Sequence, residues 1–189
     1  MFQVRIHGRG GQGAVSGAEM LSVAAFLEQK HAQAFPSFGS ERMGAPVVAF
    51  CRIDSKEIRL REPVLEPDAL LVQDPSLFNS VDVFAGLRAD GYLIINTAKS
   101  LEQLGIEDAA RQLPEGHVWT VAATELAIQH VGRPSPNACM IAALARACGT
   151  IELESVVAAI RKKFPGKVGE ANVVAAQAAF DNAKAFNAA

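Results

Sequence analysis

The sequence has few of the residues from which metal and redox centres are built. Its 189 residues include three cysteines, Cys51, Cys139 and Cys148, with no C-x-x-C spacing among them. The four histidines are not paired with carboxylates or with one another at the spacing of metal ligands. An iron–sulfur cluster needs several thiolates in close sequence groups. We therefore expect no cluster and no metal in this chain alone, and we expect Cys139 and Cys148 to be buried in a helix.

Strong net charge and long apolar runs are missing as well. The net charge is −2, and no basic run is longer than Arg161-Lys162-Lys163, so nothing predicts a nucleic-acid partner. No apolar stretch has the length of a membrane span, and the chain starts with a strand pattern where a signal peptide would stand. We expect a cytoplasmic protein without membrane contact. The length suits one well-buried core, which predicts a single domain over residues 1–189.

The most informative segment that is present is a glycine-rich turn, His7-Gly8-Arg9-Gly10-Gly11-Gln12-Gly13. A strand pattern at 2–6 precedes it, and a helical pattern at 14–29 follows. This order favours phosphate binding, because N–H groups at a helix N-terminus are unpaired and glycine lets a ligand approach the backbone. Gln12 adds hydrogen-bonding groups at the mouth of the turn. A tight turn without a ligand remains an alternative. The candidate ligand-binding residues here are Gly8, Arg9, Gly10, Gly11, Gln12 and Gly13.

The same glycines fit the dinucleotide pattern G-x-G-x-x-G, with Gly8, Gly10 and Gly13 in its fixed positions. That pattern also needs an acidic residue about twenty positions on, at the end of the second strand, to hold a ribose hydroxyl. The second strand expected here, 31–35, ends without a carboxylate, and Glu28 falls within the helix. A stand-alone NAD(P)-binding oxidoreductase therefore lacks its ribose-binding acid. A non-catalytic nucleotide-binding module is a further alternative.

Beyond the turn, strand and helix patterns alternate. A loop at 36–46, with proline at both ends, precedes a strand at 47–53, and a turn at 54–56 leads to an antiparallel partner at 57–60. Further strands are expected at 70–73, 92–96 and 118–121, and helices at 124–130, 138–148, 153–164 and 172–186. The predicted fold class is α/β: a single Rossmann-like domain with a mostly parallel sheet, an inserted β-hairpin and a helical C-terminal part.

Three more residues are candidates for ligand contact, and none forms a catalytic triad. Asn96 ends a predicted strand at the edge where ligands bind to open α/β sheets. Arg42 lies on the 36–46 loop, where its guanidinium is suited to a phosphate or carboxylate, or else pairs with Glu41. Asn137 precedes a predicted helix and either accepts backbone N–H bonds there or contacts the ligand. The chain therefore offers an anion-binding turn without a self-contained catalytic set.

The order of several motifs along the chain resembles one known family. The turn continued to Val15, the stretch Gln33-Ala-Phe-Pro-Ser-Phe-Gly-Ser-Glu-Arg42 and the run Ile58-Arg-Leu-Arg61 look like the γ subunit of 2-oxoacid:acceptor oxidoreductases, closest to the pyruvate:ferredoxin type. Further matches follow in the same order at Glu66-Pro-Asp68, Val72-Gln-Asp-Pro75, Ile94-Ile-Asn-Thr97, Ala123-Thr-Glu-Leu-Ala127, Asn137 and Phe164-Pro-Gly-Lys167. The resemblance covers essentially the whole chain.

The resemblance implies a subunit of a larger enzyme. In such complexes, α, β and δ-type subunits hold thiamine diphosphate, Mg²⁺ and [4Fe-4S] clusters, and electrons pass to ferredoxin or another acceptor. A 2-oxoacid is decarboxylated oxidatively to acyl-coenzyme A and CO₂. The γ subunit resembles a module that handles coenzyme A next to the thiamine site. One departure concerns the substrate: Met43 stands where the family often has a basic residue or glycine, which fits a larger, even aromatic, 2-oxoacid as well as pyruvate.

Overall fold

The computed structural model describes residues 1–37 and 43–186, which form one seven-stranded sheet with helices on its faces. The strands stand in the order β2-β3-β1-β4-β5-β6-β7. Neighbours β1, β4, β5 and β6 pair in parallel, whereas β3 is antiparallel to both β1 and β2, and β7 is antiparallel to β6. Five strands therefore point the same way, which confirms the α/β fold with a mostly parallel sheet. The strands are β1 (Phe2–Arg9), β2 (His31–Pro36), β3 (Pro46–Asp54), β4 (Ala69–Val72), β5 (Tyr92–Asn96), β6 (Val118–Val121) and β7 (Lys184–Ala185).

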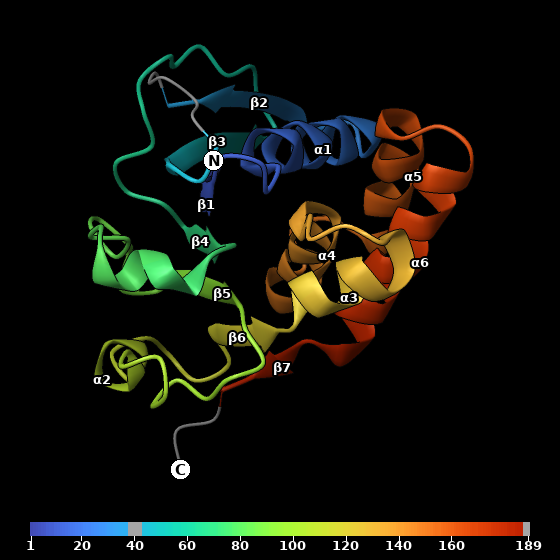
Figure 1. Ribbon diagram of the computed structural model, residues 1–189. Helices are drawn as coiled ribbons and strands as arrows, with labels where there is room; N and C mark the ends of the chain where they lie inside the picture. Colours follow the sequence, from blue (N-terminus) through green and yellow to red (C-terminus); the bar gives the residue numbers. More distant parts are fainter. Residues whose placement is uncertain (38–42, 187–189) are drawn as a thin grey trace.

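The long helices cover one face of the sheet, and short helices cover part of the other (Figure 1). The larger core packs α1, α4, α5 and α6 against alternate residues of the strands, such as Val4 and Ile6 of β1. The smaller core, on the opposite face, includes Leu70 and Val72 of β4 and the short helix α2. Alternation along β4 places Leu71 in the larger core and its two neighbours in the smaller one. The helices are α1 (Ala14–Leu27), the 3₁₀ helix η1 (Pro75–Asn79), α2 (Glu107–Ala110), α3 (Ala123–Val131), α4 (Asn137–Cys148), α5 (Leu153–Lys163) and α6 (Lys167–Asn182).

The inserted hairpin is made by β2 and β3, and the prediction of a strand at 57–60 was wrong. Residues 57–60 have no regular structure, because both edges of β3 are already paired, with β1 on one side and β2 on the other. Two buried arginines hold the segment that follows. Arg52 donates from Nη2 to the carbonyl oxygen of Glu62 (2.6 Å), and Arg5 Nη1 donates to the carbonyl oxygen of Val64 (3.5 Å).

The other expected elements are present, with shifted ends in places. The last helix starts at Lys167 rather than at 172 and ends at Asn182 rather than at 186. It starts earlier because Gly166, at φ 70°, turns the chain directly into the helix. It ends earlier because Lys184 and Ala185 pair with β6. Within the described ranges, no helix combines the length and the apolarity that spanning a bilayer requires.

Candidate functional site

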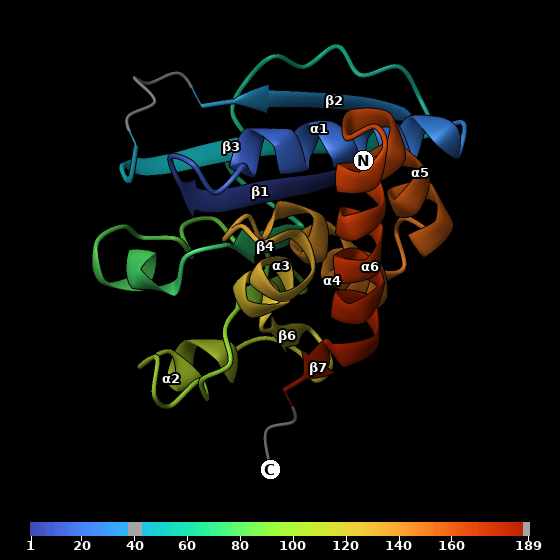
Figure 2. The ribbon, with the colours of Figure 1, turned by 45° about the vertical axis from the view of Figure 1, so that its right-hand side comes forward.

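The glycine turn lies at the edge of the sheet where β1, β4 and β5 have their carboxyl ends (Figure 2). Two of the cavities at this edge are lined by residues of the turn. The first, which we call the turn cavity, has a volume of about 220 Å³ and is lined by Arg9, Gly10, Gly11, Gly13, Ala14, Val15, Ser16 and Val47. The second, which we call the edge cavity, has a volume of about 450 Å³ and is lined by Gln12, Gln73, Asp74, Pro75, Ser76, Asn96, Thr97, Ala98, Lys99, Leu104, Thr124 and Glu125.

Backbone conformation at the turn presents unpaired N–H groups to the turn cavity. Gly11 and Gly13 have φ angles of 97° and 76°. Residues with a Cβ atom rarely adopt such positive φ angles, so both positions require glycine. Gly13 is the N-cap of α1 and provides no side-chain cap for the helix. No described residue accepts a hydrogen bond from the N–H groups of Gly11, Gly13 or the first helical residues 14–16. A left-handed residue followed by a helix N-terminus forms a concave cluster of N–H groups that suits an anion.

Asn137 contacts the turn from a distant part of the sequence. It is the first residue of α4 and is 2 % exposed. A Cβ atom at Gly13 would lie 2.5 Å from Asn137 Nδ2, so the two residues are in direct contact. Asn137 Oδ1 accepts hydrogen bonds from the Ala138 N–H (2.9 Å) and from Ser135 Oγ (3.3 Å). No described residue accepts a hydrogen bond from Asn137 Nδ2, so this donor beside Gly13 has no partner among the described residues.

Gly8 is required for a different reason, because a buried amide fills the space beside it. A Cβ atom there would lie 2.7 Å from Gln73 Oε1. Gln73 follows β4 and is 1 % exposed, and neither polar atom of its side chain has a hydrogen-bond partner among the described residues. The first glycine of the pattern therefore allows β1 to pack against the end of β4.

The side chains of the turn form a network with the segment after β4. Asp74 Oδ2 accepts a hydrogen bond from Gln12 Nε2 (2.9 Å) and lies 3.2 Å from Arg9 Nε. Gln12 Oε1 in turn accepts from the Arg9 N–H (2.8 Å). Partial burial alone raises the pKa of Asp74, but hydrogen bonds from Ser76 and Gln12 and the charge of Arg9 outweigh burial and lower it. Asp74 is therefore ionised near neutral pH.

The Arg9 guanidinium contacts neighbouring groups through each of its three nitrogen atoms. Its Nη2 donates to Ser76 Oγ (2.8 Å), and its Nη1 donates to the carbonyl oxygen of Gly44 (3.0 Å). Arg9 thus ties the turn both to η1 and to the loop before β3. The backbone of the turn joins the same loop, because the Gly10 N–H donates to the carbonyl oxygen of Ala45 (2.9 Å).

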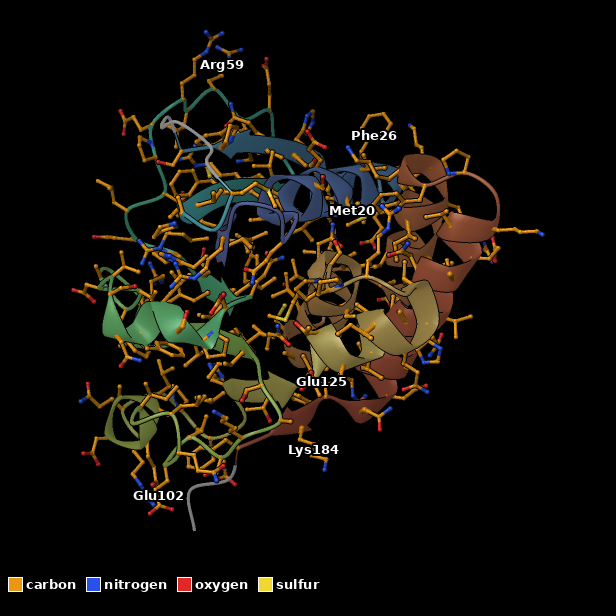
Figure 3. The ribbon with its side chains drawn as sticks, viewed as in Figure 1. Met20, Phe26, Arg59, Glu102, Glu125 and Lys184 are labelled. Atoms are coloured by element: carbon orange, nitrogen blue, oxygen red, sulfur yellow. The ribbon has the colours of Figure 1, made fainter. Side chains whose placement is uncertain are left out.

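Asn96 belongs to the wall of the edge cavity. Its Nδ2 donates to the carbonyl oxygen of Gln73 and to Thr124 Oγ1, each at 2.7 Å. Its Oδ1 accepts from the Thr124 N–H (3.0 Å), so both ends of the amide are used to join β4, β5 and α3. The charged residues in the described lining of this cavity are Asp74, Lys99 and Glu125, and Glu125 lies in the first turn of α3 (Figure 3). Arg9 is the only charged residue among the described lining of the turn cavity, and its charge is paired with Asp74, so the capacity of this cavity for an anion comes from the backbone N–H groups of the turn.

The loop before β3 covers part of the turn. Met43 is 86 % exposed, and its Cε would lie 3.0 Å from a Cβ atom at Gly11. Arg42, a predicted anion-binding residue, and Glu41 lie outside the described residues. Met43 therefore brings the described end of this loop to the rim of the turn cavity.

Gln73 and Asp74 were not among the predicted ligand contacts, although Asp74, like Asn96, follows a predicted strand at the edge where ligands bind. Both follow β4 directly, at the edge of the sheet where the turn also lies. Of the predicted ligand contacts, the structure brings Asn137 to the turn, places Asn96 across the edge cavity and engages Arg9 and Gln12 in the Asp74 network.

The described residues contain no group of three or more histidine, cysteine, aspartate or glutamate side chains arranged to hold a metal ion. Cys51 and Cys139 are buried, and Cys148 is half-buried. Burial raises the pKa of Cys51 and raises that of Cys139 to about 12, so both thiols are protonated and unreactive near neutral pH.

Comparisons with known proteins agree with one another along the whole chain. Residues 3–182 match the family model described as pyruvate ferredoxin/flavodoxin oxidoreductase. The pyruvate/ketoisovalerate oxidoreductases common subunit gamma of Pyrococcus abyssi is 47 % identical, over 98 % of this chain and 99 % of that protein. The pyruvate synthase subunit PorC of Methanothermobacter marburgensis is 44 % identical, over 97 % and 98 %. The crystal structure of pyruvate oxidoreductase subunit PORC from Thermotoga maritima superimposes with a TM-score of 0.82 at 37 % identity, and the match covers 98 % of each chain.

Proposed function

This chain belongs to the pyruvate ferredoxin/flavodoxin oxidoreductase family as a gamma-type subunit, and we propose that it supplies the coenzyme A site of a 2-oxoacid oxidoreductase complex. The observation that carries the proposal is the cluster of unpaired N–H groups at the turn cavity. Coenzyme A is rich in phosphate, and backbone N–H groups at a helix N-terminus bind phosphate without a cationic side chain.

Each predicted residue has a place in this proposal. Phosphate oxygens accept hydrogen bonds from Gly11, Gly13 and the first turn of α1, with Asn137 Nδ2 as an additional donor. Gly8 lets β1 approach the end of β4, and the Gly10 N–H binds the loop before β3. Arg9, Gln12 and Asn96 shape the two cavities through the contacts described above. Arg42 adds a guanidinium from the loop next to Met43.

The remaining chemistry belongs to other subunits. We propose that α, β and δ-type partners hold thiamine diphosphate, Mg²⁺ and [4Fe-4S] clusters, and that ferredoxin or another acceptor takes the electrons. The spacing of the three cysteines supports this division, because they do not form the close sequence groups that ligate a cluster. The named relatives are themselves subunits: one is a common subunit shared by pyruvate and ketoisovalerate oxidoreductases. We place the complex in the cytoplasm.

The sheet order argues against the nicotinamide alternative. In a dinucleotide-binding fold, the ribose-binding acid ends the strand next to the glycine turn. Here β3 lies between β1 and β2, so the end of β2 is not adjacent to the turn. β2 also ends at Phe35 and Pro36, which carry no carboxylate.

The proposal is tested by Gly11→Val in the purified complex, with Gly116→Val as the matched control. Both glycines have a positive φ, 97° and 78°, so valine strains the backbone at both. Only Gly11 borders the turn cavity; Gly116 precedes β6 at the opposite edge of the sheet, and a Cβ atom there would meet nothing within 4 Å.

We expect Gly11→Val to raise the KM for coenzyme A by about tenfold or more, the size of one lost hydrogen bond to a charged group, with a much smaller change in the KM for the 2-oxoacid. Gly116→Val should change neither. Fluorescence titration with NADH should show no binding to the full chain. An unchanged KM for coenzyme A in a well-assembled Gly11→Val complex contradicts the proposal.

A further inference from the structure

We propose that Asp74 is a positioning residue for the coenzyme A site: through Gln12 and Arg9, it fixes the conformation of the glycine turn. This inference rests on the proposed function. Asp74 lies outside the turn, between β4 and η1. We expect its carboxylate to control the affinity for coenzyme A without contacting the ligand.

The two carboxylate oxygens of Asp74 have separate partners. Oδ1 accepts from the Ser76 N–H (3.0 Å) and from Ser76 Oγ (2.6 Å), which caps η1. Oδ2 faces the turn, where Gln12 Nε2 donates to it at 2.9 Å and Arg9 Nε lies at 3.2 Å. One oxygen therefore serves the local helix, and the other serves the ligand site.

Gln12 passes the effect of Asp74 to the backbone of the turn. Its Oε1 accepts from the Arg9 N–H (2.8 Å), and its own N–H donates to the Arg9 carbonyl oxygen (3.0 Å). Gln12 stands between Gly11 and Gly13, the two residues with positive φ. Its side chain is thus held at both ends, by Asp74 and by the backbone at Arg9, and this bridge restricts the residues that present the unpaired N–H groups.

The hydrogen-bonding pattern requires an acceptor at this position of residue 74. Gln12 Nε2 and Arg9 Nε are both donors. An asparagine at position 74 that keeps its Oδ1 hydrogen-bonded to Ser76 would place its Nδ2, which is also a donor, against these two groups. Gln12 cannot turn its amide over to compensate, because its Oε1 is already the acceptor for the Arg9 N–H. An aspartate therefore fits where its uncharged isostere does not.

The test compares three variants of the complete complex. Asp74→Asn should raise the KM for coenzyme A by about tenfold, the effect of losing a hydrogen bond to a charged group, and leave the KM for the 2-oxoacid within about twofold. Asp74→Ser keeps a good cap for η1 but is too short to reach Gln12, so it should show the same split. The double variant Asp74→Asn, Gln12→Glu exchanges donor and acceptor at the same net charge, and it should restore most of the coenzyme A affinity.

Asp90→Asn is the control, because the Asp90 side chain is 71 % exposed and pairs only with Arg88 among the described residues. It should change neither KM. Amide hydrogen exchange at Arg9, Gly10 and Gln12 of the full chain, whose N–H groups donate hydrogen bonds in and around the turn, supplies a readout that does not need activity. We expect faster exchange there in Asp74→Ser than in Asp90→Asn.

The outcomes separate this inference from the proposed function. If Gly11→Val raises the KM for coenzyme A and the Asp74 variants do not, the proposed function stands and the inference is overturned. A parallel rise in both KM values, without rescue by the double variant, assigns Asp74 a general structural role and also overturns it. If Gly11→Val has no effect, the proposed function fails, and unchanged amide exchange in Asp74→Ser then rejects positioning of the turn as well.

Discussion

The side-chain amide of Asn137 occupies the space in which a side chain at Gly13 would lie, with Nδ2 only 2.5 Å from the position of a Cβ atom. This contact joins the N-terminus of α4 to that of α1. It explains why the last glycine of the turn cannot be replaced, since both its φ angle of 76° and its neighbour exclude a side chain. The two residues therefore form one unit of the site.

A double-mutant cycle tests that unit. Gly13→Ala should lower the free energy of unfolding by about 1 to 3 kcal/mol, because alanine is strained at positive φ and meets Asn137. In an Asn137→Ala background the same change should cost about 1 kcal/mol less, since only the backbone strain remains. Urea unfolding of the full chain gives the free energy of unfolding of the wild type, the two single variants and the double variant. Additive effects would show that the two residues do not interact.

Stability should depend on the protonation of His7. His7 is 6 % exposed, and burial, followed by the charge of Arg5, lowers its pKa to about 4 from an ordinary 6.5. The unfolded chain therefore binds a proton more readily, and stability is lost as the pH falls from about 6.5 towards 4, by up to about 3 kcal/mol. His7→Leu removes this titration, so its stability should change less over that range. Parallel pH profiles for the two proteins would contradict the prediction.

Arg52 should protect the segment that links β3 to β4. Its guanidinium donates hydrogen bonds to the carbonyl oxygens of Glu62 and Pro63. Trypsin sites lie just before these two residues, and one of them, Arg59, has an exposed side chain (Figure 3). Arg52→Gln removes these bonds, and we expect several-fold faster tryptic cleavage within 56–61, because the segment opens more often. Arg88→Gln, at an exposed ion pair, is the control and should leave the cleavage rate unchanged. Equal rates in both variants would show that other contacts hold the segment.

The cysteines should differ in reactivity. In the native full chain, Cys148 should react with iodoacetamide first, because it is half-buried while Cys51 and Cys139 are buried. Burial raises the pKa of all three thiols, so each should react much more slowly than in denaturant. Mass spectrometry of partly alkylated protein identifies the modified residues. Rapid labelling of Cys139 under native conditions would argue for an accessible thiol and against a purely structural role.

The sequence alone determined the features that depend on neighbouring residues. The glycine turn between β1 and α1 was predictable because alternation, glycine and helical spacing are local signals, and the strands at 92–96 and 118–121 followed from short apolar runs. Family membership was predictable too, since the order of motifs is a property of the chain.

Only the tertiary structure decided which segments meet. The strand expected at 57–60 does not form, because β1 and β2 occupy both edges of β3, and no local signal reports which edges are taken. The contact of Asn137 with Gly13, and the bonds from Asp74 to the turn, join residues far apart in the sequence. Such partners are selected by packing and by the satisfaction of buried hydrogen bonds, which depend on the arrangement of all the elements at once.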